Sequence, residues 1–194
     1  MLAKKECEIG PHETRLELSK KMSHIGAELM LTVLQDLSTY MDSRQPQPEG
    51  HFKLAPKISR EMFEITWEKK TALEVYNQWR ALSDMGKLYS FWAKTGSIVR
   101  LERASMIPSD LMEKISSTYP DSQAGRVVSL RTKSVPRIIA VKCAQGWISF
   151  QKFSYSSKKA MNVQDFYSGF IAPCKNGGVY FCTDEQRHPS KLSL

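Results

Sequence analysis

The chain has 194 residues, and its 28 Lys and Arg outnumber its 20 Asp and Glu, so its formal net charge is +8. This length accommodates one domain, or one domain and part of another. Hydrophobic residues make up 41% of the sequence, which suffices for a sizeable core and excludes a wholly disordered chain. No run approaches the roughly 20 apolar residues of a membrane-spanning helix. The first eight residues lack the apolar centre of a signal peptide, so we expect no membrane span and no targeting segment.

The first 42 residues are predicted to form a short strand over residues 1–9 and one helix. Thr14 and Glu17 have the spacing of a capping box, in which the two residues satisfy each other's backbone N–H at a helix start. An apolar helical face needs a partner, and none lies nearby in the sequence. Residues 1–42 are therefore interpreted as the last strand and helix of an α/β domain. The apolar residues recur at steps of three and four: Leu18, Met22, Ile25, Leu29, Val33 and Leu37.

Residues 43–60 are polar and contain prolines, so they are predicted to be a linker. Thr71 and Glu74 then form a second capping box, opening a helix that ends near Gly86. Asn162 is expected to begin a short helix over residues 163–170. Five runs rich in β-branched and aromatic residues are predicted to be strands: residues 90–93, 97–107, 125–130, 138–144 and 147–155.

Five short strands with a helix at each end predict a small β-barrel of the oligonucleotide-binding type over residues 61–173. The fold class of the whole chain is accordingly α+β. Residues 174–194 contain few periodic apolar residues and are predicted to be a disordered tail. The four cysteines show no C-x-x-C pair and fit no common zinc spacing, so no metal site is predicted.

The positive charge is concentrated in one part of the chain. Residues 1–50 hold six Lys and Arg against eight Asp and Glu, whereas residues 51–173 hold 19 against ten. The run from residue 122 to 164 contains eight bases and no acid. Such a run is compatible with an anionic partner and equally with the solvated face of a basic protein.

Several segments resemble the methionyl-tRNA formyltransferase family. Leu54-Ala55-Pro56-Lys57-Ile58-Ser59, Ile65-Thr66-Trp67 and Arg80-Ala81-Leu82 are similar to its linker and the start of its C-terminal domain. Gly146-Trp147-Ile148 and Lys158-Lys159-Ala160-Met161-Asn162-Val163-Gln164-Asp165-Phe166 resemble its C-terminal signature. The resemblance covers about residues 1–173, and the added tail is more like mitochondrial members. It implies that residues 1–42 are the last strand and helix of the family's Rossmann-like catalytic domain. One departure is Ser83-Asp84-Met85-Gly86-Lys87, which stands where the family often has a Pro-rich turn.

The resemblance implies formyl transfer from 10-formyltetrahydrofolate to initiator methionyl-tRNA in the mitochondrial matrix. The family's Asn-x-His pair, Ser-Leu-Leu-Pro segment and catalytic Asp do not occur in this sequence. No catalytic residue is therefore assigned, and we expect this chain alone to be an inactive monomer that binds no folate. It is interpreted as the tRNA-binding C-terminal part of a longer enzyme.

Basic side chains on the barrel and its flanks are the predicted tRNA contacts, because phosphates select for Lys and Arg on one surface. Side chains at alternate positions of a strand share a face, so those on neighbouring strands are expected to project together. The predicted contacts are Lys57, Arg60, Arg126, Arg131, Lys133, Lys142, Lys152, Lys158 and Lys159.

Three alternatives remain open. The barrel is compatible with a non-catalytic RNA-binding module unrelated to formylation, which would not prefer initiator tRNA. A sibling formyl-folate enzyme, a hydrolase or a sugar-amine formyltransferase, fits less well because of the Lys158-Lys159-Ala160-Met161 signature. An interaction fragment made by alternative splicing or an internal start is the third.

Overall fold

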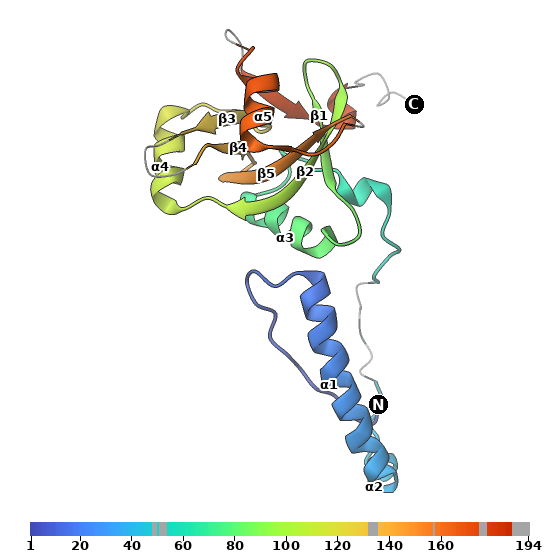
Figure 1. Cartoon of the computed structure of the whole chain (residues 1–194). Coiled ribbons are helices and arrows are strands. Elements are labelled where there is room, and N and C mark those ends of the chain that lie inside the picture. The colour runs from blue at the N-terminus through green and yellow to red at the C-terminus, as the bar shows by residue number, and fades with distance from the viewer. Residues whose placement is uncertain (48–49, 51–53, 132–135, 157, 175–177, 188–194) are drawn as a thin grey trace. The chain divides into compact units, whose positions relative to one another are not determined.

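The computed structural model describes every residue except 48–49, 51–53, 132–135, 157, 175–177 and 188–194 (Figure 1). The chain divides into two compact units, Met1–Ile58 and Ser59–Leu194. The division falls inside the predicted linker, whose described residues from 44 to 59 form no helix or strand. In the described parts of the chain, no helix is long and apolar enough to cross a membrane.

The first unit contains helix α1 (Arg15–Gln35) and the short helix α2 (Leu37–Asp42). The predicted capping box is confirmed: Thr14 Oγ1 accepts from the Glu17 N–H at 3.4 Å, and the Thr14 N–H donates to Glu17 Oε2 at 2.8 Å. The strand predicted over residues 1–9 is wrong, because those residues form none. A strand needs a hydrogen-bonded neighbour, and the described residues of this unit contain no strand for it to pair with.

The apolar face predicted for α1 is only partly covered. Val33 is buried and Leu18, Ile25 and Leu29 are half-buried, whereas Met22 and Leu37 are 55% and 44% exposed. The predicted helix therefore forms, and the sheet expected to cover it is not among the described residues.

The second unit is built on a closed antiparallel barrel. Six strands each pair with two neighbours in the cyclic order β1-β2-β5-β4-β3-β7. A two-residue strand, β6 (Met161–Asn162), adds to β5 outside this ring. The predicted α+β class with a small closed barrel is thus confirmed. The six barrel strands are β1 (Leu88–Trp92), β2 (Ser97–Met106), β3 (Arg126–Leu130), β4 (Ile138–Lys142), β5 (Trp147–Tyr155) and β7 (Val179–Cys182).

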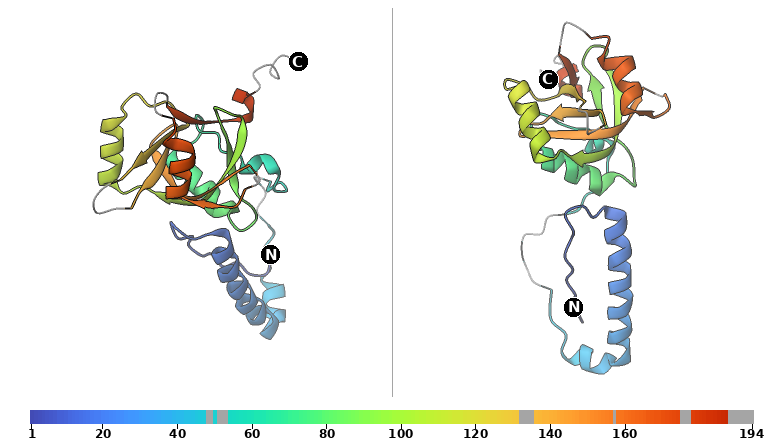
Figure 2. Two further views of the ribbon diagram at one scale, coloured as in Figure 1. Left: turned by 45° about the horizontal axis from the view of Figure 1, so that its top comes forward. Right: turned by 60° about the vertical axis from the view of Figure 1, so that its left-hand side comes forward.

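Helices flank the barrel, with α3 and α5 at opposite ends and α4 along one side (Figures 1 and 2). The second capping box is present before α3, where Thr71 Oγ1 accepts from the Glu74 N–H at 3.2 Å. Helix α4 was not expected from the sequence. The helical segments are η1 (Arg60–Phe63), α3 (Ala72–Leu82), α4 (Ser109–Thr118), α5 (Val163–Phe166), η2 (Tyr167–Ile171) and α6 (Asp184–Arg187).

The disordered tail predicted over residues 174–194 is wrong for its central part, which forms β7 and α6. Strand β7 lies between β1 and β3, with Phe91 opposite Cys182 and Val127 opposite Val179. Without it both neighbours would have an unpaired edge, so pairing across the gap is what orders the segment. Residues 175–177 and 188–194 lie outside the described residues.

Two apolar clusters hold this unit together. The barrel interior is aromatic: Trp67 is fully buried and stacks on Phe181, and Phe153 stacks on Phe166 with ring centroids 4.3 Å apart. A second cluster lies under α4, where Ile115 packs against the outer face of β3 and β4 with Trp147. The core thus occupies both faces of the β3–β4 pair, which leaves their ends for polar side chains.

Candidate nucleic-acid interface

The described cations of the acid-free run have no carboxylate partner among the described residues. Among the described residues of that run, no Lys or Arg forms an ion pair with a carboxylate. Outside it, Lys69, Lys87 and Arg187 do form such pairs, with Glu185, Glu102 and Asp184. A cation without an internal partner can pair with an external anion without first breaking a contact.

Arg126 and Lys142 lie next to each other at one end of the β3–β4 pair. Val127 is opposite Val141, so the preceding Arg126 and the following Lys142 also face each other across the two strands. The Arg126 guanidinium lies 4.9 Å from the centre of the Tyr119 ring. The Lys142 ammonium lies 5.7 Å from the centre of the Trp147 ring. The two aromatic rings stabilise both cations by cation–π attraction and leave their charge intact.

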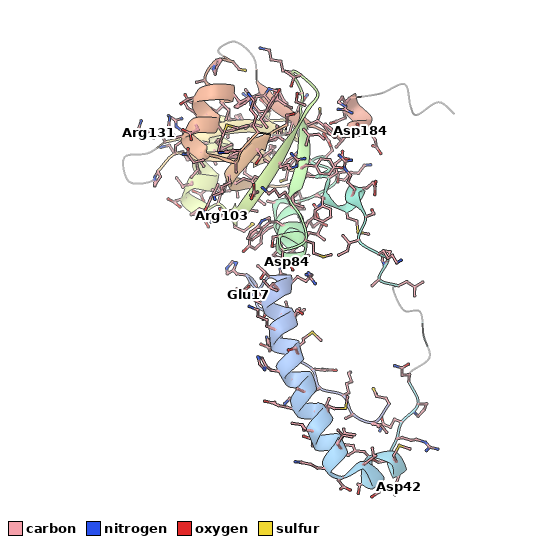
Figure 3. All side chains as sticks on the ribbon, turned by 45° about the vertical axis from the view of Figure 1, so that its right-hand side comes forward. Glu17, Asp42, Asp84, Arg103, Arg131 and Asp184 are labelled. Atoms are coloured by element: carbon pink, nitrogen blue, oxygen red, sulfur yellow. The ribbon has the colours of Figure 1, made fainter. Side chains whose placement is uncertain are left out.

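Arg131 lies at the opposite end of the same strand pair and projects outward from the barrel (Figure 3). It follows Arg126 by five positions of extended chain, a distance of about 16 Å. The structure therefore brings Arg126 and Lys142 together and places Arg131 apart from them. Its neighbour across the hairpin is Arg137, which belongs to the acid-free run and was not among the predicted contacts.

Lys152 lies on another part of the outer face, because the regular inward and outward alternation of side chains along β2 and β5 is interrupted. Between the buried Phe150 and Phe153, the two consecutive side chains Gln151 and Lys152 both leave the core. On the paired strand β2, Arg103 has φ of 55°, which breaks the alternation at the same level. Lys152 pairs in register with Glu102, whose carboxylate binds Lys87 at 2.7 Å.

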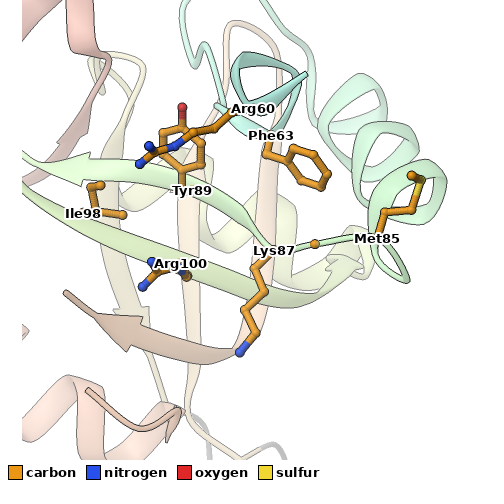
Figure 4. Close-up of a pocket in the computed structure, with 8 residues that line it drawn as sticks. Arg60, Phe63, Met85, Lys87, Tyr89, Ile98 and Arg100 are labelled. Carbon is orange, nitrogen blue, oxygen red and sulfur yellow. The ribbon is translucent and has the colours of Figure 1, made fainter. Parts of the chain in front are cut away.

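Arg60 lines a pocket of about 260 Å³ at the outer face of β1 and β2 (Figure 4). Lys87, which directly precedes β1, and Arg100 of β2 line the same pocket, and Tyr89 contributes an aromatic ring. Burial, and then the nearby Glu64 carboxylate, raise the pKa of the Tyr89 hydroxyl, so it stays protonated and can donate. Three cations thus line one small pocket, and one of them, Lys87, is paired with the Glu102 carboxylate at 2.7 Å.

Sequence reasoning missed Lys87 and Arg100 in this pocket, together with Arg137. Lys87 and Arg100 lie outside the acid-free run, where acids are interspersed, so composition alone carried no signal for them. A signal existed in the strand pattern, since Tyr89 pairs with Arg100 and alternate positions share a face.

The remaining predicted contacts are dispersed. Lys57 is exposed and belongs to the first unit, while Lys158 and Lys159 are exposed between β5 and β6. Lys133 lies outside the described residues. Within the described residues, no group of three or more His, Cys, Asp or Glu could hold a metal ion. Burial raises the pKa of the Cys143 thiol to about 12, so this cysteine is a core residue rather than a nucleophile.

Comparisons with known proteins place these features in a family. The model of the formyl transferase C-terminal domain matches residues 57–171, more than half of the chain. A mitochondrial methionyl-tRNA formyltransferase of Homo sapiens is 28% identical over 188 residues, which are 94% of this chain and 44% of that protein. A methionyl-tRNA formyltransferase of Alkaliphilus oremlandii is 24% identical over 87% of this chain and 49% of that protein.

The chain therefore spans about half the length, or less, of the relatives it matches. Among solved structures, a variant of HypX from Aquifex aeolicus aligns with a TM-score of 0.51 at 15% identity, over 83% of this chain and 27% of that one. At this identity the similarity supports the fold. The matched region of the family model ends before strand β7, which closes the barrel.

Proposed function

Because the chain belongs to the formyl transferase C-terminal domain family, we propose that its second unit is the tRNA-binding domain of a methionyl-tRNA formyltransferase. The longer protein would transfer a formyl group from 10-formyltetrahydrofolate to methionine carried by initiator tRNA, for translation initiation in mitochondria. The relatives that bear this name in Homo sapiens, Mus musculus and Bos taurus are mitochondrial enzymes.

One observation carries the proposal: the acid-free run presents cations that have no carboxylate partner among the described residues. An RNA backbone offers one negative charge per nucleotide, and each phosphate neutralised by Lys or Arg releases a condensed counterion. Arg126 with Lys142 would take adjacent phosphates, because the two cations face each other across the β3–β4 pair. Lys152 and the Arg60 pocket would continue the contact along the outer face of β1, β2 and β5.

Under this proposal the chain contributes no catalytic residue to formyl transfer. Formyl transfer needs a general base for the attacking amine and donors for the oxyanion of the tetrahedral intermediate. The Asn-x-His pair and the Asp that the resemblance implies for these roles are absent from the sequence. We expect the purified 194-residue chain to produce no formyl-methionyl-tRNA above background in a turnover assay. Product formation by this chain would contradict that assignment.

Binding of tRNA tests the proposal directly. The affinity for initiator methionyl-tRNA, measured by fluorescence anisotropy between 50 and 300 mM salt, should fall linearly on a log–log plot, at about −0.9 per phosphate contacted. The double variant Arg126→Ala, Lys142→Ala should flatten this slope by about two and weaken binding. The matched control is Lys94→Ala, which removes an exposed cation from the turn between β1 and β2. An unchanged slope in the double variant would contradict the proposed interface.

A general RNA-binding module is the second candidate, favoured by the closed barrel that resembles oligonucleotide-binding folds. The same anisotropy measurement separates the two functions. Preference for initiator methionyl-tRNA over an elongator tRNA supports the formyltransferase assignment, and equal affinity for both supports the general module.

A further inference from the structure

A groove of about 770 Å³ lies where β4 and β5 meet β6 and α5. The described residues that line it include two arginines, Arg131 and Arg137, and the amide side chains Gln151, Asn162 and Gln164, but no carboxylate. The volume falls within the range of roughly 300–1,000 Å³ that is typical of small-ligand sites. The groove is separate from the Arg126–Lys142 pair and from the Arg60 pocket described above.

Arg137 is held rigidly in this groove. Its guanidinium lies 3.5 Å from the centre of the Tyr167 ring, Nη1 donates to Ser129 Oγ at 2.7 Å, and Nε donates to Gln164 Oε1 at 3.1 Å. Contacts from β3, α5 and η2 therefore fix one planar cation before any ligand arrives. A preorganised group loses little conformational entropy on binding, and guanidinium planes stack on nucleobases as aromatic rings do.

The amides beside Arg137 supply donors and acceptors. Gln151 is exposed, because it follows the inward-facing Phe150 on β5, and no hydrogen bond to its side chain is present among the described residues. Asn162 Oδ1 accepts from the Asp165 N–H at 2.9 Å as the cap of α5, which leaves its amide NH₂ available. Primary amides match the mixed donor and acceptor edges of unpaired bases.

The Arg60 pocket differs in both size and chemistry. It has about 260 Å³ and is lined by cations, aromatic rings and apolar side chains, with no amide. Such a pocket suits a phosphate group. The larger groove combines a flat cation, amides and a second arginine at its rim, and this combination suits a whole nucleotide.

We propose that this groove binds a single unpaired nucleotide of an RNA strand. The base stacks on the guanidinium plane of Arg137, its edge faces Gln151 and Asn162, and its phosphate pairs with Arg131. This inference rests on the proposed RNA-binding function and adds to it that the domain distinguishes unpaired nucleotides from duplex.

The test uses the full 194-residue chain with two fluorescein-labelled probes, a single-stranded RNA hexamer and an RNA duplex, at one fixed salt concentration. Gln151→Ala and Arg131→Ala should each weaken binding of the hexamer about fivefold to tenfold and change duplex binding less than twofold. Arg137→Lys keeps the charge and loses the planar group, so it should weaken hexamer binding while leaving its salt slope unchanged. Arg126→Ala, outside the groove, serves as the control and should weaken both probes alike.

Gln151 and Arg131 are exposed, so both variants should keep the thermal unfolding midpoint of the parent chain. Hexamer binding that is unchanged in both variants would overturn the groove proposal. Displacement of the hexamer by inorganic phosphate as effectively as by mononucleotides would also overturn it, since that result describes an anion site. If these variants behave as the parent while tRNA still binds, only the groove assignment fails. If no RNA binds the parent chain, the proposed function fails with it.

Discussion

Helices α1 and α3 begin in the same way and reach different environments. Both are opened by Thr-x-x-Glu capping boxes with nearly equal geometry, the Thr N–H donating to Glu Oε2 at 2.8 Å before α1 and 2.7 Å before α3. Helix α3 buries Ala72, Val75, Tyr76 and Leu82 against the barrel, whereas α1 buries only Val33. The start of a helix is thus decided by a few neighbouring residues, while its burial depends on a sheet far away in the sequence.

Truncation of a side chain should show the largest difference in stability effect between the two units. Trp67 is fully buried, donates from Nε1 to Ser90 Oγ at 2.8 Å and packs on Phe181 and Phe150. Trp67→Ala should lower the free energy of unfolding of the second unit by about 3–5 kcal/mol. Urea unfolding followed by the fluorescence of the remaining tryptophans measures this. In the control, Met30→Ala on the exposed side of α1 should change it by less than about 0.5 kcal/mol.

Substitution of glycine by alanine should lower stability in the second unit and raise it in the first. Gly125 has φ of 83°, and a Cβ there would lie 2.2 Å from the Phe181 carbonyl oxygen. Gly125→Ala should therefore cost more than about 2 kcal/mol, because it adds a backbone clash to an unfavourable left-handed conformation. Gly26 in α1 has open space around it, so Gly26→Ala should raise the helix content of the first unit, with a gain of about 0.5–1 kcal/mol. Destabilisation by both variants would show that α1 is packed in solution.

Removal of the capping threonine should cost a similar free energy in α1 and α3 but should unfold only α1. Thr71→Ala and Thr14→Ala each remove one capping hydrogen bond, worth about 1 kcal/mol. In α3, packing should retain the helix, and the loss should appear as a lower unfolding midpoint. In α1, which has one buried residue, it should appear directly as lost ellipticity at 222 nm. Full retention of that ellipticity in Thr14→Ala would indicate that packing supports α1.

Acid should produce the smallest of these effects. The backbone N–H of Thr14, and then its hydroxyl, lower the pKa of Glu17 below its ordinary 4.5, and Thr71 does the same for the pKa of Glu74. A carboxylate with a lowered pKa stabilises the folded state above 4.5, and the stabilisation is lost as the pH falls through the lowered value. Ellipticity should be constant from pH 5 to 8 and decrease below pH 4.5. Glu17→Gln should reduce that decrease, whereas Glu113→Gln in α4 should not.

Much of the barrel could be predicted from local sequence. The run over residues 147–155 coincides with β5, and three of the other four predicted strands begin or end at an observed boundary. Strand β7 and helix α4 could not be predicted in this way. Helix α4 has no side-chain cap, and its apolar residues pack on the outer face of β3 and β4, a surface that exists only after the strands have paired. The four residues of β7 are ordered by edges contributed from β1 and β3.

The candidate interface was predictable in composition and less so in geometry. The acid-free run contains Arg126, Arg131 and Lys142. Arg126 and Lys142 lie together at one end of the β3–β4 pair, whereas Arg131 lies at the other end. Arg137 could have been found as the residue across the hairpin from Arg131. The outward turn of both Gln151 and Lys152 could not, since strict alternation assigns consecutive residues to opposite faces.

Strand β7 also sets the order in which the domain can be completed during synthesis. It joins β1 and β3, and the Ser90 hydroxyl donates to the Cys182 carbonyl across 92 residues of sequence. A nascent chain on the ribosome cannot close the six-stranded barrel until residue 182 has left the exit tunnel. Until then, the edges of β1 and β3 that pair with β7 remain unpaired. Contacts of such long separation form slowly, and this period of translation is when the domain is most open to mispairing with other chains.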